Sequence, residues 1–263
     1  MQILRFKDRF ILNQNHNQIN FSWRAILFIL LAFLPFDLKA SQSIKLAIID
    51  TGFCYQKFTQ HNILLIPAFD ATSSIANLKC DDSTKNLPRF HGQKVLDTFL
   101  KYYHSKKLVK IFPIIVYDSR AETNEVYWRK TLDYIKSKSF DYAISAVGIK
   151  SSNLKLSETI RPIWFLAAAR ISPTIQKDDS IFPQNQFKNR NVYLFGSFDQ
   201  KGYVDRGQLN LTEIDLFTKD EDQNFYGSSF AVGKIAALLL NDFSKKNLVI
   251  KKVPGTFLLN DSR

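Results

Sequence analysis

The sequence predicts an α/β fold in one domain, built on a mostly parallel β-sheet with helices on both faces. Short apolar runs rich in β-branched residues alternate along the chain with polar loops and helical patterns, as in sheets joined by helical crossovers. The 263 residues are 45% hydrophobic, which is enough for one sizeable core. No internal repeat or linker divides the chain.

The first forty residues predict a secretory signal. A basic region that includes Arg24 is followed by the apolar run 25–36 and then by the small residue Ala40. The apolar run is short for a membrane span, so we expect cleavage near Ala40, with an uncleaved membrane anchor as the alternative. The mature chain, 41–263, is then secreted or periplasmic, and it has no membrane contact unless the signal is retained.

The net charge and the two cysteines limit the class of protein further. Without the first forty residues, which hold five of the 36 Lys and Arg and two of the 24 Asp and Glu, the net charge is +9. The lysines are scattered and accompany no nucleic-acid motif, which indicates a solvated surface and no nucleic-acid partner. Cys54 and Cys80 are an even pair in an exported chain, so they predict a disulfide, with two buried free thiols as the alternative.

The first predicted strand, 44–49, is a β-branched apolar run that ends at Asp50-Thr51-Gly52. This places a carboxylate at the carboxyl end of a buried parallel strand, the edge where α/β folds bind ligands. A turn-forming Asp is the alternative for Asp50. A second strand at 63–67 and a polar loop precede a helix over 90–100, which begins near His91 and has apolar residues facing inward.

The middle of the chain continues the alternation. Residues 110–117 form the next predicted strand, in which Pro113 predicts irregular or edge pairing. An amphipathic helix follows over 126–138, and then a buried strand over 141–148 that stops at a glycine. For 151–161 we expect a further helical segment.

Two more strands, 162–169 and 191–197, precede a polar stretch that we expect to contain a β-hairpin. The last predicted helix starts at Gly227-Ser228-Ser229 and continues as an apolar pattern to about residue 240. Ser228 suits an N-cap, and a serine in the first turn lies beside unpaired N–H groups at the positive end of the helix dipole. That position suits either a nucleophile or a plain helix start. Nucleotide-binding classes are excluded, because the chain has no GxGxxG after the first strand and no GxxxxGK[ST].

Three of these stretches together resemble the subtilisin-like serine proteases, whose chain order is Asp, His, Ser. They are Asp50-Thr51-Gly52, His91-Gly92 and Gly227-Ser228-Ser229-Phe230-Ala231. The resemblance implies a subtilisin-like three-layer α/β fold, with a peptidase domain over 41–263. It implies that Ser229 is the nucleophile, His91 its general base and then acid, and Asp50 the carboxylate that orients His91. It also implies a peptide or protein substrate and no cofactor.

The resemblance extends to the segments between these motifs. Ala146-Val147-Gly148 aligns with the strand that pairs with substrate backbone and lines the specificity pocket of the family. Phe182-Pro183, followed by the strand at 191–196, resembles the family's later proline-containing turn and next core strand.

The sequence also departs from the family pattern. The asparagine that helps to bind the oxyanion aligns with Ile171, which has no side-chain donor. Arg170 or Ser172 could take its place, and the alternative for Arg170 is a surface charge. Gly233 stands where the family usually has proline, and Lys94 replaces a second histidine. No pro-domain is evident before the first strand, which implies a separate folding helper or inhibitor, and no metal site is expected.

Two functions of different classes follow. Retention of all three triad residue types favours an exported serine endopeptidase. Loss of the oxyanion asparagine favours an impaired subtilisin-like pseudoprotease that binds peptides or a partner protein in the substrate groove. A small exported binding protein in which the three motifs coincide is the third alternative.

Overall fold

A computed structural model of the chain describes most of the residues after the predicted signal. The described residues are 43–54, 62–73, 90–157, 161–199, 201–204, 207–209, 211–221 and 225–241, together with two strands near the C-terminus. All of them belong to one compact unit, Ser41–Arg263. The predicted signal and Cys80 lie outside the described residues. No helix in the described part of the chain is long and apolar enough to cross a membrane.

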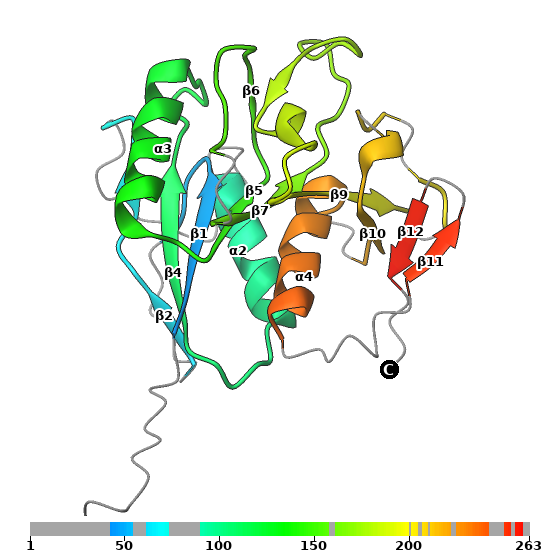
Figure 1. Cartoon of the computed structure of the whole chain (residues 1–263), viewed down its shortest axis with the longest axis horizontal. Coiled ribbons are helices and arrows are strands. Elements are labelled where there is room, and N and C mark those ends of the chain that lie inside the picture. The colour runs from blue at the N-terminus through cyan, green and yellow to red at the C-terminus, as the bar shows by residue number, and fades with distance from the viewer. Residues whose placement is uncertain are drawn as a thin grey trace, which may run out of the picture. The chain divides into compact units, whose positions relative to one another are not determined.

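The described strands form one large sheet in the order β11-β12-β10-β9-β7-β5-β1-β4-β2, with β3 also paired to β4 (Figure 1). Every pair in it is parallel except β11 with β12. A separate antiparallel pair joins β6 to β8. The bounds are β1 Ile44–Asp50, β2 Ile63–Leu65, β3 Phe69–Asp70, β4 Val109–Ile115, β5 Tyr142–Ser145, β6 Ile149–Lys150, β7 Ile163–Ala167, β8 Ile181–Phe182, β9 Val192–Phe198, β10 Leu216–Lys219, β11 Ile250–Val253 and β12 Thr256–Leu259.

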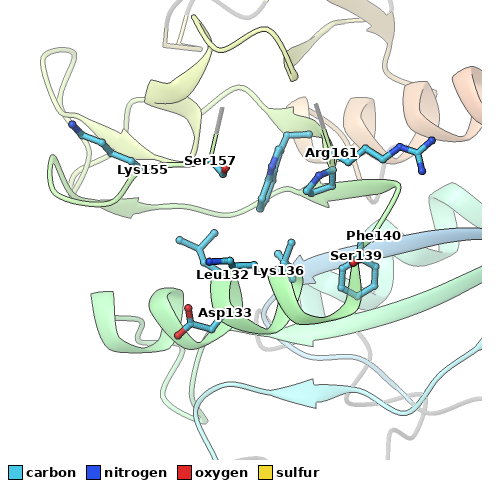
Figure 2. A pocket seen from close by; sticks show the side chains of 11 residues that line it. Leu132, Asp133, Lys136, Ser139, Phe140, Lys155, Ser157 and Arg161 are labelled. Carbon is cyan, nitrogen blue, oxygen red and sulfur yellow. The ribbon is translucent and has the colours of Figure 1, made fainter. Parts of the chain in front are cut away.

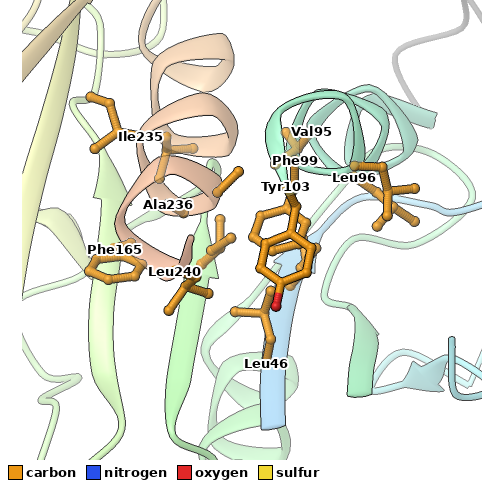
Figure 3. Close-up of a cluster of buried hydrophobic side chains, with 14 of the residues drawn as sticks. Leu46, Val95, Leu96, Phe99, Tyr103, Phe165, Ile235, Ala236 and Leu240 are labelled. Atoms are coloured by element: carbon orange, nitrogen blue, oxygen red, sulfur yellow. The ribbon is translucent and has the colours of Figure 1, made fainter. Parts of the chain in front are cut away.

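Among the described residues, three α-helices cover the sheet: α2 (His91–Tyr102), α3 (Glu125–Lys138) and α4 (Ser228–Leu240). The loops of the same part of the chain contain two short 3₁₀ turns, Gln184–Gln186 and Leu211–Glu213. Alternate residues of β1 enter different hydrophobic clusters, because successive side chains of a strand point to opposite faces. Leu46 packs with α2 and α4 (Figure 3), whereas Ala47 packs with α3. The predicted mostly parallel sheet with helices on both faces is confirmed.

The irregular pairing predicted at Pro113 has a local explanation. β4 pairs with β1 along its whole length, so it is not an edge strand. On its other side, β2 pairs only with 109–111 and β3 only with Ile114 and Ile115. Pro113 therefore falls in the gap between two short neighbours, where its missing N–H leaves no ladder bond unmade.

The helix predicted for 151–161 is wrong for the residues described there, since 151–157 and Arg161 form no helix. Ser151 Oγ accepts the N–H groups of Asn153 and Leu154 at 3.2 Å, a local turn that competes with helical bonding. The expected hairpin is present as one antiparallel bridge between Phe198 and Val204, after which β10 pairs in parallel with β9.

The start of α4 also differs from the prediction. Gly227 is the N-cap, with φ of 83°, and Ser228 is the first helical residue. The hydroxyl of Ser228 donates to the carbonyl of Ala168 at 2.6 Å instead of capping its own helix. A hydrogen bond to the end of β7 therefore anchors the helix start, and Gly227 supplies the left-handed backbone that the turn needs.

Candidate active site

The centre of the candidate site is a hydrogen bond between two predicted residues. His91 Nδ1 donates to Asp50 Oδ1 at 2.8 Å. Asp50 is fully buried at the end of β1, and the same oxygen accepts the N–H of Thr51 at 2.7 Å. Its other oxygen, Oδ2, has no partner among the described residues. The His91 side chain is 28% exposed, so its second nitrogen remains available to a reacting group.

The surroundings of His91 change its pKa in two opposing directions. Burial alone lowers the pKa of His91, but the charge of Asp50 and the hydrogen bond to it outweigh this effect and leave the pKa above 6.5. The nearby Lys94 opposes the increase slightly. A carboxylate that holds Nδ1–H in this way fixes the tautomer with Nε2 free to accept a proton.

Backbone contacts hold α2 against the end of β1. The N–H of Gln93 donates to the carbonyl of Gly52 at 3.1 Å, and Gln93 Oε1 accepts the N–H of Cys54 at 2.8 Å. A Cβ on Gly92 would lie 2.7 Å from the Asp50 Cβ. Glycine after His91 is therefore required for the close approach that forms the Asp50–His91 pair.

Ser229 lies in the first turn of α4, whose start is tied to the carboxyl end of β7 by Ser228. The two helices touch one turn further along, where a Cβ on Gly233 would lie 2.9 Å from the carbonyl oxygen of Val95. Because His91 and Ser229 each lie one turn before this crossing, both helix N-termini face the same edge of the sheet. The ring of Phe225 bridges them, with its centroid 5.4 Å from that of His91.

Of the three predicted triad residues, Asp50 and His91 are thus in direct contact. Ser229 is half-buried on the neighbouring helix, and among the described residues no hydrogen bond joins it to His91. The hydroxyl of its neighbour Ser228 already donates to the carbonyl of Ala168 and anchors the helix start. Ser229 is therefore the better candidate for a nucleophile of the two serines in this turn. Serine–histidine hydrogen bonds in ligand-free sites are often long and tighten with substrate.

The predicted oxyanion residues differ in what they offer. Ile171 is 40% exposed and has no side-chain donor. Ser172 Oγ accepts the N–H of Ile175 at 3.1 Å and lies 3.2 Å from the Thr174 hydroxyl, so it is engaged in its own loop. Arg170 is exposed and forms a backbone bridge with Gln208. Backbone N–H groups at the start of α4 are the other donors near Ser229.

The predicted substrate segment, Ala146-Val147-Gly148, is half-buried between β5 and β6. The carbonyl of Val147 accepts from Ser145 Oγ at 2.9 Å and from Gln184 Nε2 at 3.3 Å. The Tyr117 hydroxyl donates to the carbonyl of Gly148. A Cβ on Gly148 would lie 2.5 Å from Gln184 Oε1. This segment is therefore held from both sides.

Tyr117 and Gln184 were not predicted from the sequence. Tyr117 follows β4 and reaches Gly148 beyond β5, so it crosses the end of β1. Burial raises its pKa to about 12, and the negative charge of Asp50 adds to the increase. The sequence could have pointed to Tyr117 only through its position just after the strand β4, at the edge of the sheet where ligands bind. Gln184 lies in a 3₁₀ turn that is too short to show a pattern.

A pocket beside the start of β7 contains none of the predicted site residues. It has a volume of about 410 Å³ and is lined by α3 and the segment before β7. Figure 2 shows Lys155 and Arg161 pointing in opposite directions rather than toward a shared point. Elsewhere, Cys54 is buried and disulfide-bonded, while its predicted partner Cys80 lies outside the described residues. No three His, Cys, Asp or Glu of the described chain are grouped to hold a metal ion.

Comparison with solved structures identifies a shared fold. The chain is similar to the protease domain of PatA, solved as a serine-to-alanine mutant, with a TM-score of 0.54. Sequence identity is 13%, and the match covers 77% of this chain and 81% of that one. No family model and no curated protein sequence matches. The predicted α/β, subtilisin-like fold is confirmed, since the sheet and its helices correspond to those of a protease domain.

Proposed function

We propose that the chain is an exported serine endopeptidase that hydrolyses peptide bonds through an acyl-enzyme on Ser229. The observation that carries the proposal is the buried Asp50 carboxylate bonded to His91 Nδ1 beside the helix start that holds Ser229. A serine hydroxyl needs such a base, because it is a weak nucleophile near neutral pH. The shared fold with a protease domain supports the same assignment.

In the proposed reaction, Ser229 Oγ attacks the substrate carbonyl carbon while His91 Nε2 takes the hydroxyl proton. His91 then gives this proton to the leaving amine as the C–N bond breaks, and Asp50 stabilises the imidazolium in between. Water deacylates the enzyme by the same route, with His91 again as the base.

The developing oxyanion would be stabilised by backbone N–H groups in the first turn of α4, where the helix dipole favours negative charge. A side-chain donor is missing at Ile171, and loss of one such donor costs roughly 100- to 1000-fold in turnover. Slow hydrolysis is therefore expected, with Arg170 as the side chain that could supply a compensating positive charge.

A second candidate is an impaired pseudoprotease that binds peptides or a partner protein. Two observations favour it: Ile171 in place of a donor, and the absence of a Ser229–His91 hydrogen bond among the described residues. The internal bonds to the carbonyls of Val147 and Gly148 point the same way, because they occupy acceptors that an extended substrate would use.

A fluorophosphonate probe separates the two candidates. Ser229 Oγ forms a bond to phosphorus, fluoride leaves, and His91 receives the hydroxyl proton. We expect labelling of the folded protein that Ser229→Ala abolishes, while Ser137→Ala on the exposed part of α3 labels as the parent protein does. Ser228→Ala should remain labelled, though more slowly. Folded protein that does not react at all would rule out the enzyme and leave the binder.

A further inference from the structure

The apolar helix α4 contains one buried lysine that the proposed reaction does not use. Lys234 is 1% exposed, and its ammonium lies 2.7 Å from Glu221 Oε1. Burying a lysine is unfavourable unless its charge is paired, so this side chain needs its partner. Glu221 lies at the surface end of the pair, where it is 36% exposed.

The pair is completed by a side chain from α2. Tyr102 donates its hydroxyl to Glu221 Oε2, and its ring lies under the Lys234 ammonium, 5.1 Å from the centroid. Lys234, Glu221 and Tyr102 therefore join α4, the loop after β10 and the end of α2. Burial raises the pKa of Glu221, but the hydrogen bonds from Lys234 and Tyr102 outweigh this and lower it.

Glu221 is linked to the candidate site through its neighbour Asp220. Asp220 Oδ1 accepts the N–H of Gly227 at 2.9 Å, at the turn before Ser228 and Ser229. Phe225, two residues before Gly227, packs edge-on against His91 and against Phe230. Phe230 in turn packs edge-on against Tyr102. A chain of side-chain contacts therefore links Lys234 to His91 through Tyr102, Phe230 and Phe225.

We propose that the Lys234–Glu221–Tyr102 cluster is a positioning device. It fixes Gly227 through Asp220, and it fixes Phe225 against His91 through Tyr102 and Phe230. Lys234 and Glu221 act through these contacts and touch no reacting atom, so they are positioning residues. The expected effect on the labelling rate rests on the proposed function. The expected effect on the position of Phe225 against His91 does not depend on catalysis.

The test compares Lys234→Met and Glu221→Ala with Lys101→Met. Methionine keeps the apolar stem and leaves Glu221 to water, and Glu221→Ala removes both hydrogen bonds of the anchor. Lys101 also lies over the Tyr102 ring, at 5.3 Å, but it is exposed to solvent, which makes it a matched control for the buried Lys234. We expect fluorophosphonate labelling to slow at least 10-fold in the first two variants, measured well below their unfolding midpoints, and to stay unchanged in the control. Glu221→Gln keeps the side-chain shape and one acceptor oxygen for Lys234, and its amide NH2 can donate to the Tyr102 oxygen, so this variant should recover part of the rate.

A second readout follows the His91 ring by proton NMR. The chain has four histidines, so the His91 signal is assignable by its loss in His91→Gln. Displacement of Phe225 should shift this signal in Lys234→Met and in Glu221→Ala. Unchanged labelling and an unchanged His91 signal in both would overturn the positioning role. If the parent protein does not label, the proposed function fails, and the His91 signal alone decides the present proposal. If either single variant does not fold, the double variant Lys234→Met with Glu221→Ala, which leaves no buried charge without its partner, decides it.

Discussion

At the scale of single residues, the Asp50–His91 hydrogen bond would determine the proton transfer of the proposed reaction. Asp50→Asn keeps the shape but removes the charge, so we expect the pKa of His91 to fall and labelling to slow by about 10⁴-fold. Asp133→Asn, on the exposed face of α3, is the control. The measurements are labelling rates and an NMR titration of His91. A pKa that does not move in Asp50→Asn would contradict the coupling.

The same pair sets the direction of the pH dependence. The pKa of His91 is raised above 6.5, so labelling of the parent protein should fall as the pH drops through this raised value. The stabilising effect of the pair has the opposite sense. It is present below the unfolded pKa of histidine and is lost as the pH rises through the folded pKa.

A substitution at Ile171 should increase the proposed peptidase activity. Ile171→Asn places an amide where the resembling family has one, and the 40% exposure of Ile171 means that the exchange empties no core. We expect turnover to rise, by up to about 100-fold, with little change in the unfolding midpoint. The control is Ile171→Leu, which should leave turnover as it was. No gain in Ile171→Asn would mean that this side chain does not face the oxyanion.

At the scale of elements, the crossing of α2 and α4 fixes the distance between His91 and Ser229. Gly→Ala inside a helix normally stabilises by roughly 0.5–1 kcal/mol. At Gly233 the new Cβ would meet the carbonyl of Val95 at 2.9 Å, so the helices must separate. We expect Gly233→Ala to destabilise the fold by about 1–3 kcal/mol and to slow labelling, measured by denaturant unfolding and probe kinetics. A more stable variant would show that the crossing is looser than described.

The elements also show how far the sequence could predict this molecule. Buried parallel strands have near-continuous apolar patterns, so β1, β4, β7 and β9 were predicted near their observed bounds. The two-residue strands β6 and β8 are too short for any period. The segment 151–157 misled the prediction, because Leu154 and Leu156 are buried from an irregular loop.

Sequence motifs predicted Asp50, His91 and Ser229 as candidate site residues, because the proposed chemistry is tied to residue type and chain order. Lys234 was missed for the opposite reason. It interrupts an apolar helix, and its partners Glu221 and Tyr102 are adjacent only in the folded chain. Tyr117 and Gln184 belong to the same class, since each contacts the 147–148 segment from a distant part of the sequence.

At the scale of the whole molecule, the predicted export should change the covalent structure of the chain in two ways, by cleavage of the signal and by formation of a disulfide. We expect the secreted protein to begin at Ser41 and to carry a bond between Cys54 and Cys80, the two cysteines of the chain. Intact-mass measurement before and after reduction and alkylation, with N-terminal sequencing, checks both. A chain that retains its first forty residues would indicate a membrane anchor instead.

The two helices that bear His91 and Ser229 both point their N-termini at one place on the sheet edge. Both helices contribute a positive dipole end, and the first turn of α4 adds backbone N–H groups, so that place attracts anions as well as a developing oxyanion. In α2, the N–H groups of Gly92 and Gln93 already donate to Thr51 and Gly52. In the proposed reaction, the carboxylate that hydrolysis of the acyl-enzyme would free is such an anion. Product inhibition by peptide acids, weakening as salt is added, is the kinetic behaviour that this arrangement favours.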